Sequence, residues 1–357
     1  MAIENLKLIE IDDLINLIGK DLEPIRCALS DSPYSEQISA VPPDILDYGF
    51  LEAALLQNYA ETIRKLVKFS SGNIKKLLLA LSKKLEVSNI KTMLRAVKAQ
   101  IDVDEALKNI VPVDTLDVNR YRAILEAAKS IEDIIAALSD FEYGKVLKHA
   151  VEEPSGITDL TRLEVALDKA VYRGILEQIE KLTGVDKKIA KDVLGIELDA
   201  VNVKVILKGK ELAVSPEIMK SYFVPTAFFN EAILEEAMEV ADAKSMMERL
   251  SMIVDSAHPV YKRIFTQTLN ESSAPLSRLE AILDKAPLEM SLYQLKEHSR
   301  YYNIGFLLAF LNLKWAEVKN LRCIVKGSER KIPAIQVQKL LTIPDDWQTS
   351  QFVCRPS

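Results

Sequence analysis

The sequence contains few of the residues that interrupt helices. Only 11 Gly and 14 Pro occur among its 357 residues. Leu, Ala, Glu, Lys and Ile dominate instead, a composition that favours long helices over strands and turns. A chain of 357 residues is long enough to bury a large core. We therefore predict an all-α fold with almost no sheet.

Cysteine is scarce and scattered. Cys27, Cys323 and Cys354 form no CxxC pair, so the sequence indicates neither a disulfide framework nor a zinc site. This cysteine usage fits a reducing cytoplasm.

Motifs for catalysis and cofactor binding are also lacking. Of the residues three positions before a histidine, only Asp255, ahead of His258, is a type that ligates metals. Gly144-Lys145 and Gly209-Lys210 lack the other residues of a P-loop, and no GxSxG or GxGxxG motif occurs. We expect no catalytic residue, no cofactor and no metal site.

Neither charge nor hydropathy indicates direct contact with nucleic acid or a membrane span. The formal net charge is −6, which disfavours broad contact with nucleic acid or anionic lipid, although local basic faces remain compatible with it. The opening residues lack the basic and apolar regions of a secretory signal. The best apolar run, Gly305–Leu311, is far shorter than the roughly 20 residues that span a bilayer. We expect a cytoplasmic protein that reaches the membrane only through a partner complex.

An internal repeat is the main positive signal. An acid, an Asn three positions later, and basic residues two and six positions after the Asn occur three times, at offsets of 113 and 118 residues. Apolar residues around each Asn follow the i, i+3, i+4 stripe of an amphipathic helix. The repeated positions are Glu86, Asn89, Lys91 and Arg95; Asp199, Asn202, Lys204 and Lys208; and Glu317, Asn320, Arg322 and Lys326.

Two further elements recur in the same order. A short motif ending in Leu-Glu is found at Gly49–Glu52, Thr161–Glu164 and Ser277–Glu280. We predict that its first residue is the N-cap of a helix in each copy, with capping boxes at Thr161 and Ser277. A weaker element aligns Asp13–Ile18, Asp133–Leu138 and Ser245–Leu250.

Three elements in one order at nearly one period predict three similar helical-bundle units. We place them at 1–127, 128–239 and 240–340, with an irregular tail at 341–357.

The repeated polar residues allow more than one role. The acid and Asn share a helix edge beside the apolar stripe, where they are expected to bond neighbouring backbone and fix helix contacts; three carboxylate sites are the less favoured alternative. The basic positions form three equivalent edges. These edges either are solvated or pair with acids on neighbouring helices, or they bind a protein partner.

The residues of the repeat also carry a resemblance. Leu85–Arg95, and above all Asn303–Leu311 running into Ala316–Gly327, resemble the C/d subunit family of rotary A/V-type ATPases. This family includes the C subunit of archaeal A-type ATP synthases and the d subunit of V-type ATPases. The resemblance covers the sequence from about residue 10 to about residue 342.

The resemblance implies a fold, a function and partners. Members are funnels of three similar helical bundles around a pseudo-threefold axis. They are non-catalytic rotor subunits of the central stalk, which couple the D and F subunits of the central shaft to the membrane proteolipid ring during ATP-linked proton or sodium transport. The family also implies a peripheral place at the membrane, through the complex.

One departure from the family and one alternative remain. Members usually begin with an additional helix rich in Ala, Arg and Tyr, whereas this sequence opens almost directly at the Asp13 element, so we expect the first unit to lack its first helix. The alternative function is an α-helical scaffold that binds peptides or helices. A period of about 115 residues argues against it, since solenoid repeats run about 20–45 residues.

Overall fold

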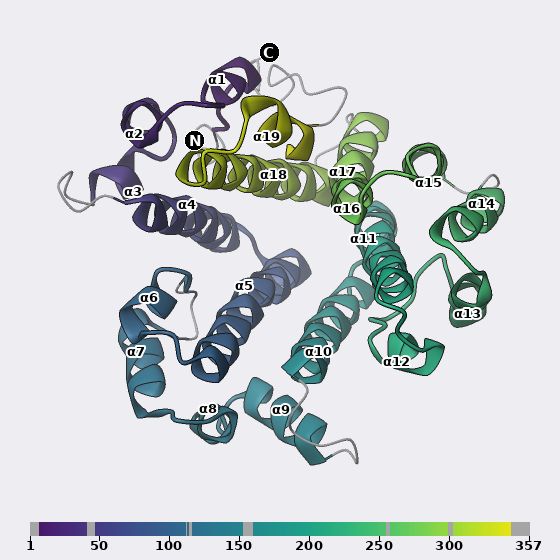
Figure 1. Ribbon diagram of the computed structural model, residues 1–357, viewed down its shortest axis with the longest axis horizontal. Helices are drawn as coiled ribbons and strands as arrows, with labels where there is room; N and C mark the ends of the chain where they lie inside the picture. The colour runs from purple at the N-terminus through teal and green to yellow at the C-terminus, as the bar shows by residue number, and fades with distance from the viewer. Residues whose placement is uncertain are drawn as a thin grey trace. The chain divides into compact units, whose positions relative to one another are not determined.

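The computed structural model is helical throughout the residues that it describes, which are 7–40, 47–111, 113, 116–152, 160–254, 258–298 and 303–343 (Figure 1). Within these ranges no strand occurs, and the extended backbone pairing is an isolated bridge between Val113 and Leu116. The predicted all-α class is confirmed. The helices are α1 Ile11–Asn16, α2 Leu22–Ser30, α3 Ser35–Ser39, α4 Tyr48–Phe69, α5 Gly72–Ala99, α6 Val103–Leu107, α7 Val118–Ala127, α8 Ile131–Ala137, α9 Glu142–Glu152, α10 Leu160–Glu180, α11 Gly184–Glu211, α12 Pro216–Ser221, α13 Glu231–Glu239, α14 Ala243–Val254, α15 Pro259–Asn270, α16 Leu276–Leu283, α17 Ala286–Glu297, α18 Ile304–Glu329 and α19 Ala334–Leu340.

The helices gather into two compact units. One comprises Leu29–Lys181, and the other the described residues of Met1–Ala28 and Leu182–Ser357. In the first unit α5 packs along α10, and in the second α11 packs along α16 and α17. These contacts join helices from neighbouring predicted segments. The two compact units are therefore defined by packing between the long helices, and they do not coincide with the three predicted segments. The boundaries at 127 and 239 stay a prediction.

The three long helices α5, α11 and α18 carry the repeated motif, and their apolar stripes face the core. Ile90 and Met93 of α5 are fully buried, as are Val203 and Ile206 of α11. Leu321 of α18 is fully buried at the corresponding position. The stripe predicted from spacing therefore gives the inward face of each long helix.

Each long helix ends in the same way. Gln100, Ala213 and Lys331 take left-handed backbone conformations with φ near +50°. The residue after each donates its N–H to a carbonyl five positions earlier, at Ala96, Gly209 and Gly327, over 2.8–2.9 Å. This is the Schellman ending, which satisfies carbonyls that the helix leaves without a partner.

A short helix then packs back on the long one with a small residue against a larger one. A Cβ atom added at Gly209 would lie 2.1 Å from Sδ of buried Met219 in α12. One added at Gly327 would lie 2.5 Å from Cγ2 of Val337 in α19. The first copy has Ala96 and Ala106 at the corresponding positions, both buried. In each copy, a small residue on the long helix thus leaves room for the side chain of the short helix, so the pair fits the closely packed interior.

The predicted helix caps are wrong. Asp47, two residues before Gly49, caps α4 by accepting the Phe50 N–H over 2.8 Å. Thr161 is the second residue of α10 as described, and Ser277 lies inside the first turn of α16 after Pro275. Proline at the N-cap position has no side-chain acceptor, so the capping box predicted from Ser277 and Glu280 does not form there.

Two predictions about the chain ends fall partly outside the described residues. Residues 341–343 follow α19 without helix, and the rest of the predicted tail, from 344 onward, lies outside them. Residues 1–6 also lie outside them.

We predict that Gly209→Ala destabilises the fold through Met219. Ala gains about 1 kcal/mol of helix propensity over Gly, but overpacking a core typically costs about 1–3 kcal/mol. The double variant Gly209→Ala/Met219→Ala recreates the Ala96 and Ala106 pair. Its loss in free energy of unfolding, measured with urea, is expected to be at least about 1 kcal/mol smaller than the sum of the two single losses.

Gly174→Ala in α10 is the control, because a Cβ there meets nothing within 4 Å, and it is expected to stabilise. Additive effects at 209 and 219 would contradict the clash.

Candidate functional site

Three asparagines each bind both backbone groups of a residue that lies 22 positions further along the chain. Asn89 accepts the N–H of Val111 over 2.9 Å and donates to its carbonyl over 2.6 Å. Asn202 makes the same two bonds to Val224, over 2.9 and 3.3 Å. Asn320 makes them to Thr342, over 2.7 and 3.0 Å. A side-chain amide has one donor face and one acceptor face, so it can replace a neighbouring strand for one residue.

These bonds fix the path of the chain after each short helix. Val111, Val224 and Thr342 follow α6, α12 and α19, and all three are buried at 4% exposure. A buried backbone N–H and C=O require partners. The asparagines themselves are at most 2% exposed. Each asparagine therefore holds in place the segment that follows the short helix, by bonding its buried backbone.

The acids of the first two copies each receive a tyrosine hydroxyl. Tyr143, in α9, donates to buried Glu86. Tyr261, in α15, donates to Asp199 over 2.7 Å, and Asp199 also accepts the backbone N–H groups of Phe228 and Phe229. In terms of the predicted segments, each tyrosine comes from the segment after the one that holds the acid.

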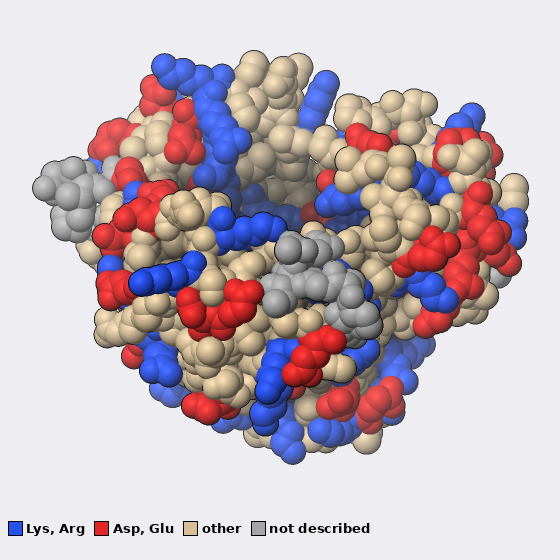
Figure 2. Space-filling view, turned by 60° about the horizontal axis from the view of Figure 1, so that its bottom comes forward, with Lys and Arg blue, Asp and Glu red and all other residues tan. Residues whose placement is uncertain are grey.

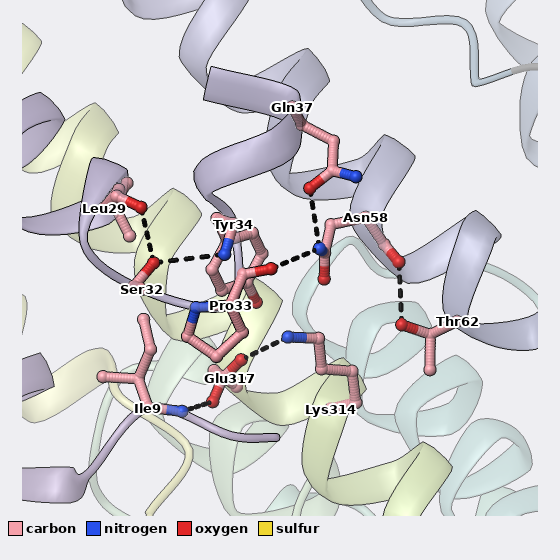
Figure 3. A network of polar contacts seen from close by, with 10 residues as sticks. All are labelled: Ile9, Leu29, Ser32, Pro33, Tyr34, Gln37, Asn58, Thr62, Lys314 and Glu317. Carbon is pink, nitrogen blue, oxygen red and sulfur yellow. Dashed lines mark hydrogen bonds and ion pairs between the residues drawn. The ribbon is translucent and has the colours of Figure 1, made fainter. Parts of the chain in front are cut away.

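The acid of the third copy is held differently. Buried Glu317 accepts the backbone N–H of Ile9 over 2.5 Å and the ammonium group of Lys314 over 2.8 Å (Figure 3). The Lys314 side chain is only 2% exposed. Because Ile9 belongs to the first predicted segment, the third acid is also bonded to another copy. The helix α2 follows α1 as α9 follows α8, but its sequence contains no tyrosine.

Four of the predicted basic residues pair with acids on, or directly after, a neighbouring helix. On α5, Lys91 contacts Asp168 and Arg95 contacts Glu164, both on α10 and both over 2.6 Å. In the second compact unit Lys204 of α11 contacts Asp284, which follows α16, over 2.6 Å, and Lys208 contacts Glu280 of α16 over 2.7 Å. The basic residues of the asparagine motif thus form ion pairs with acids of, or just after, the Leu-Glu motif. The acids were recognisable from sequence, since they recur four positions apart, as the basic residues do.

The basic positions of the third copy differ. Lys326 lies 3.7 Å from Glu329 on the same helix, a surface pair with 44% of the lysine side chain exposed. Arg322 is half-buried on α18. The structure therefore places all twelve predicted residues on three equivalent helices, with the acids and asparagines inside and the basic residues at the edges. Their role as a partner-binding set stays a prediction.

Burial and charge shift the pKa values of the acids in opposite directions. Burial raises the pKa of Asp199 to about 6, and the bonds from Tyr261, Phe228 and Phe229 offset only part of that effect. Burial also acts on Asp284, but the ammonium groups of Lys204 and Lys319 outweigh it and lower the pKa. Burial next to Glu86 and Asp199 raises the pKa of Tyr143 and Tyr261, respectively, so both phenols stay protonated donors.

Another buried polar cluster was not predicted. Asn58, in α4, donates to the Pro33 carbonyl over 2.9 Å and to the Gln37 side chain over 2.8 Å, as Figure 3 also shows. It has no counterpart in the other copies, where the aligned residues are Ala170 and Ala286. A search for repeats therefore gave no signal for it.

The described residues show no group of three or more His, Cys, Asp or Glu side chains arranged to hold a metal ion. Among the same residues, no helix has both the length and the apolar character needed to cross a bilayer.

These features define an all-helical protein in which one polar motif fastens three equivalent helices. Comparison with known proteins gives the family. The chain belongs to the ATP synthase (C/AC39) subunit family, whose model matches residues 5–340. The resemblance seen in the sequence is thereby confirmed, and the family consists of non-catalytic subunits of the ATP synthase complex.

Curated relatives cover most of the chain. The C subunit of the A-type ATP synthase of Methanocaldococcus jannaschii is 25% identical over 94% of this chain and 80% of its own length. The C subunit from Methanosphaera stadtmanae is 26% identical over 91% of this chain and 84% of its own. That from Archaeoglobus fulgidus is 23% identical over 94% of this chain and 92% of its own.

We predict opposite pH dependences for two carboxylates. The pKa of Asp199 is raised in the fold, so its contribution to stability is greatest at low pH and is lost as pH rises through about 6. Asp199→Asn, which cannot ionise, should therefore gain about 2 kcal/mol relative to the wild type between pH 4 and pH 7. The free energy of unfolding in urea at several pH values measures this difference.

Asp284→Asn is the matched control for that series. Because the pKa of Asp284 is lowered in the fold, its contribution is present at neutral pH and lost as pH falls. This variant should lose stability relative to the wild type as pH rises. The same pH trend in both variants would contradict the assignment of charge at these two sites.

Proposed function

We propose that the chain is the central-stalk rotor subunit of an A/V-type rotary ATPase. In this proposal it couples the central shaft, made of the D and F subunits, to the membrane proteolipid ring during ATP-linked proton or sodium transport. Its three copies form similar bundles around a pseudo-threefold axis, as a funnel that receives the shaft. Membership of the C/AC39 family supports the proposal.

The observation that carries the proposal is the repeated connection between copies. Glu86 bonds Tyr143, Asp199 bonds Tyr261, and Glu317 bonds Ile9. Each bond joins an acid of one predicted segment to a group of another. A part that transmits torque must resist sliding of its helices against one another, and buried hydrogen bonds with one satisfied geometry oppose such sliding.

The basic edges would serve contact with partners. Arg95, Lys208 and Lys326 keep 59%, 56% and 44% of their side chains exposed even where they are paired. On the face drawn in Figure 2, basic and acidic side chains are interspersed. A mixed polar surface suits a broad contact in which complementary charges set orientation, with affinity spread over many residues.

Removing the subunit should separate ATP hydrolysis from ion transport. We expect membranes that lack this chain to show no ATP-driven proton or sodium uptake, and its addition to restore uptake. The catalytic subunits should still hydrolyse ATP without it, because the proposal gives this chain no part in the chemistry. Purified chain should also bind both the D and F heterodimer and the isolated ring.

The Gly174→Ala variant is a suitable control in the reconstitution. It should restore ion uptake as the wild type does, because the change should leave the fold intact. Ion uptake that is the same with and without the chain would rule out the proposed coupling, and so would failure to bind both shaft and ring.

A further inference from the structure

The turn between α4 and α5 has an unusual charge. From residue 62 to residue 85 the sequence has seven basic residues and no acid, although the whole chain has a net charge of −6. The basic residues are Arg64, Lys65, Lys68, Lys75, Lys76, Lys83 and Lys84.

The structure exposes the middle of this stretch. We call the set Lys65, Lys68, Phe69, Lys75 and Lys76 the basic tip. All five residues are exposed, and the Phe69 ring is the most notable, with 64% of the residue accessible to solvent. The tip lies where α4 ends at Phe69 and α5 begins at Gly72.

The turn has a defined conformation. Gly72 has a φ of +58°, which favours glycine, and nothing lies within 4 Å of the position of a Cβ there. Asn73 donates its side-chain N–H to the carbonyl of Lys181 over 2.7 Å, which holds the turn against the chain just after α10. The charges and the ring are therefore presented together on a fixed turn.

The lysines of the tip are not neutralised within the described part of the chain. Lys65, Lys68, Lys75 and Lys76 form no ion pair with any described residue. Further along α5, by contrast, Lys83 pairs with Glu142, and Lys91 pairs with Asp168. Within the described residues the unpaired positive charge is thus concentrated where α4 ends and α5 begins, which leaves it available to an anionic partner.

The composition of the tip favours a lipid surface over a protein surface. Protein interfaces are enriched in Arg and depleted in Lys, because the flexible, strongly hydrated ammonium group is costly to immobilise. A diffuse layer of anionic headgroups imposes no fixed geometry and attracts each nearby Lys by electrostatics. Segments that lie at a membrane surface combine Lys and Arg with Trp, Phe or Leu, and the tip combines lysines with Phe69.

We propose that the basic tip binds anionic phospholipid headgroups, with the Phe69 ring entering the headgroup layer. The proposal deepens the proposed function and rests on it for its place in the complex, because a subunit seated on a membrane ring has one end near lipid. Binding of the tip to lipid would then orient the subunit beside the ring.

The test is co-sedimentation of the full chain with vesicles of phosphatidylglycerol or of phosphatidylcholine. We expect binding to phosphatidylglycerol that weakens steeply as salt increases, and much weaker binding to phosphatidylcholine. The triple variant Lys68→Gln/Lys75→Gln/Lys76→Gln should reduce affinity about a hundredfold, at about 1 kcal/mol for each lysine near the surface. Phe69→Ala should reduce binding to both kinds of vesicle.

A matched control removes the same charge elsewhere in the same compact unit. Lys129, Lys145 and Lys148 are exposed on or beside α8 and α9, and the triple change of these to Gln should leave vesicle binding unchanged. Circular dichroism of each variant verifies that it is folded. Equal binding by the tip variant and the wild type would overturn the proposal, and so would equal binding to the two lipids.

The outcomes also separate this inference from the proposed function. If vesicles are not bound but the isolated proteolipid ring is, and the tip variant loses the ring, the tip is a protein-docking surface and the lipid proposal is wrong. If vesicles are bound through the tip but neither shaft nor ring is, the rotor function fails while the lipid surface stands.

Discussion

The structure depends on one interaction made three times: an asparagine side chain that satisfies both backbone groups of a residue 22 positions away. Asn89, Asn202 and Asn320 each do this from inside a long helix. The bond pair holds down the segment after the short helix, and the Schellman ending with its small residue sets where that short helix begins. Because the amide must point one way to satisfy both groups, it also fixes the register of the segment on the long helix.

The acid three positions before each asparagine forms a hydrogen bond with another copy of the repeat, but these three contacts differ in chemistry. The first two use a tyrosine hydroxyl, whereas the third uses a backbone amide and a buried lysine, Lys314. A buried ion pair stabilises only while both partners are present, since removal of one leaves an uncompensated charge. The third contact also depends on Ile9, so it forms only when the segment just before α1 packs against α18.

Much of this could be predicted from sequence because residue types recur at constant offsets. The long helices, their inward stripes and the positions of acid and asparagine all follow from a period near 115 residues. Their partners were harder to predict. Tyr143 and Tyr261 lie 57 and 62 residues after their acids, so the spacing between acid and tyrosine is not the same in the two copies. Ile9 contributes only backbone, which carries no side-chain signal. The helix caps were mispredicted because Asp47 and Pro275 take the cap positions and do not recur among the copies.

The most direct test of the account compares the three asparagines with one another. Asn89→Ala, Asn202→Ala and Asn320→Ala each leave a buried N–H and a buried C=O without a partner, at a cost of about 1–3 kcal/mol per group. Urea unfolding should therefore show a loss of at least about 2 kcal/mol in each variant. Asn73→Ala, which removes an exposed bond to a carbonyl, should lose less than about 1 kcal/mol. If any of the three buried asparagines could be replaced as cheaply as Asn73, the three sites would not be equivalent fasteners and the account would be wrong.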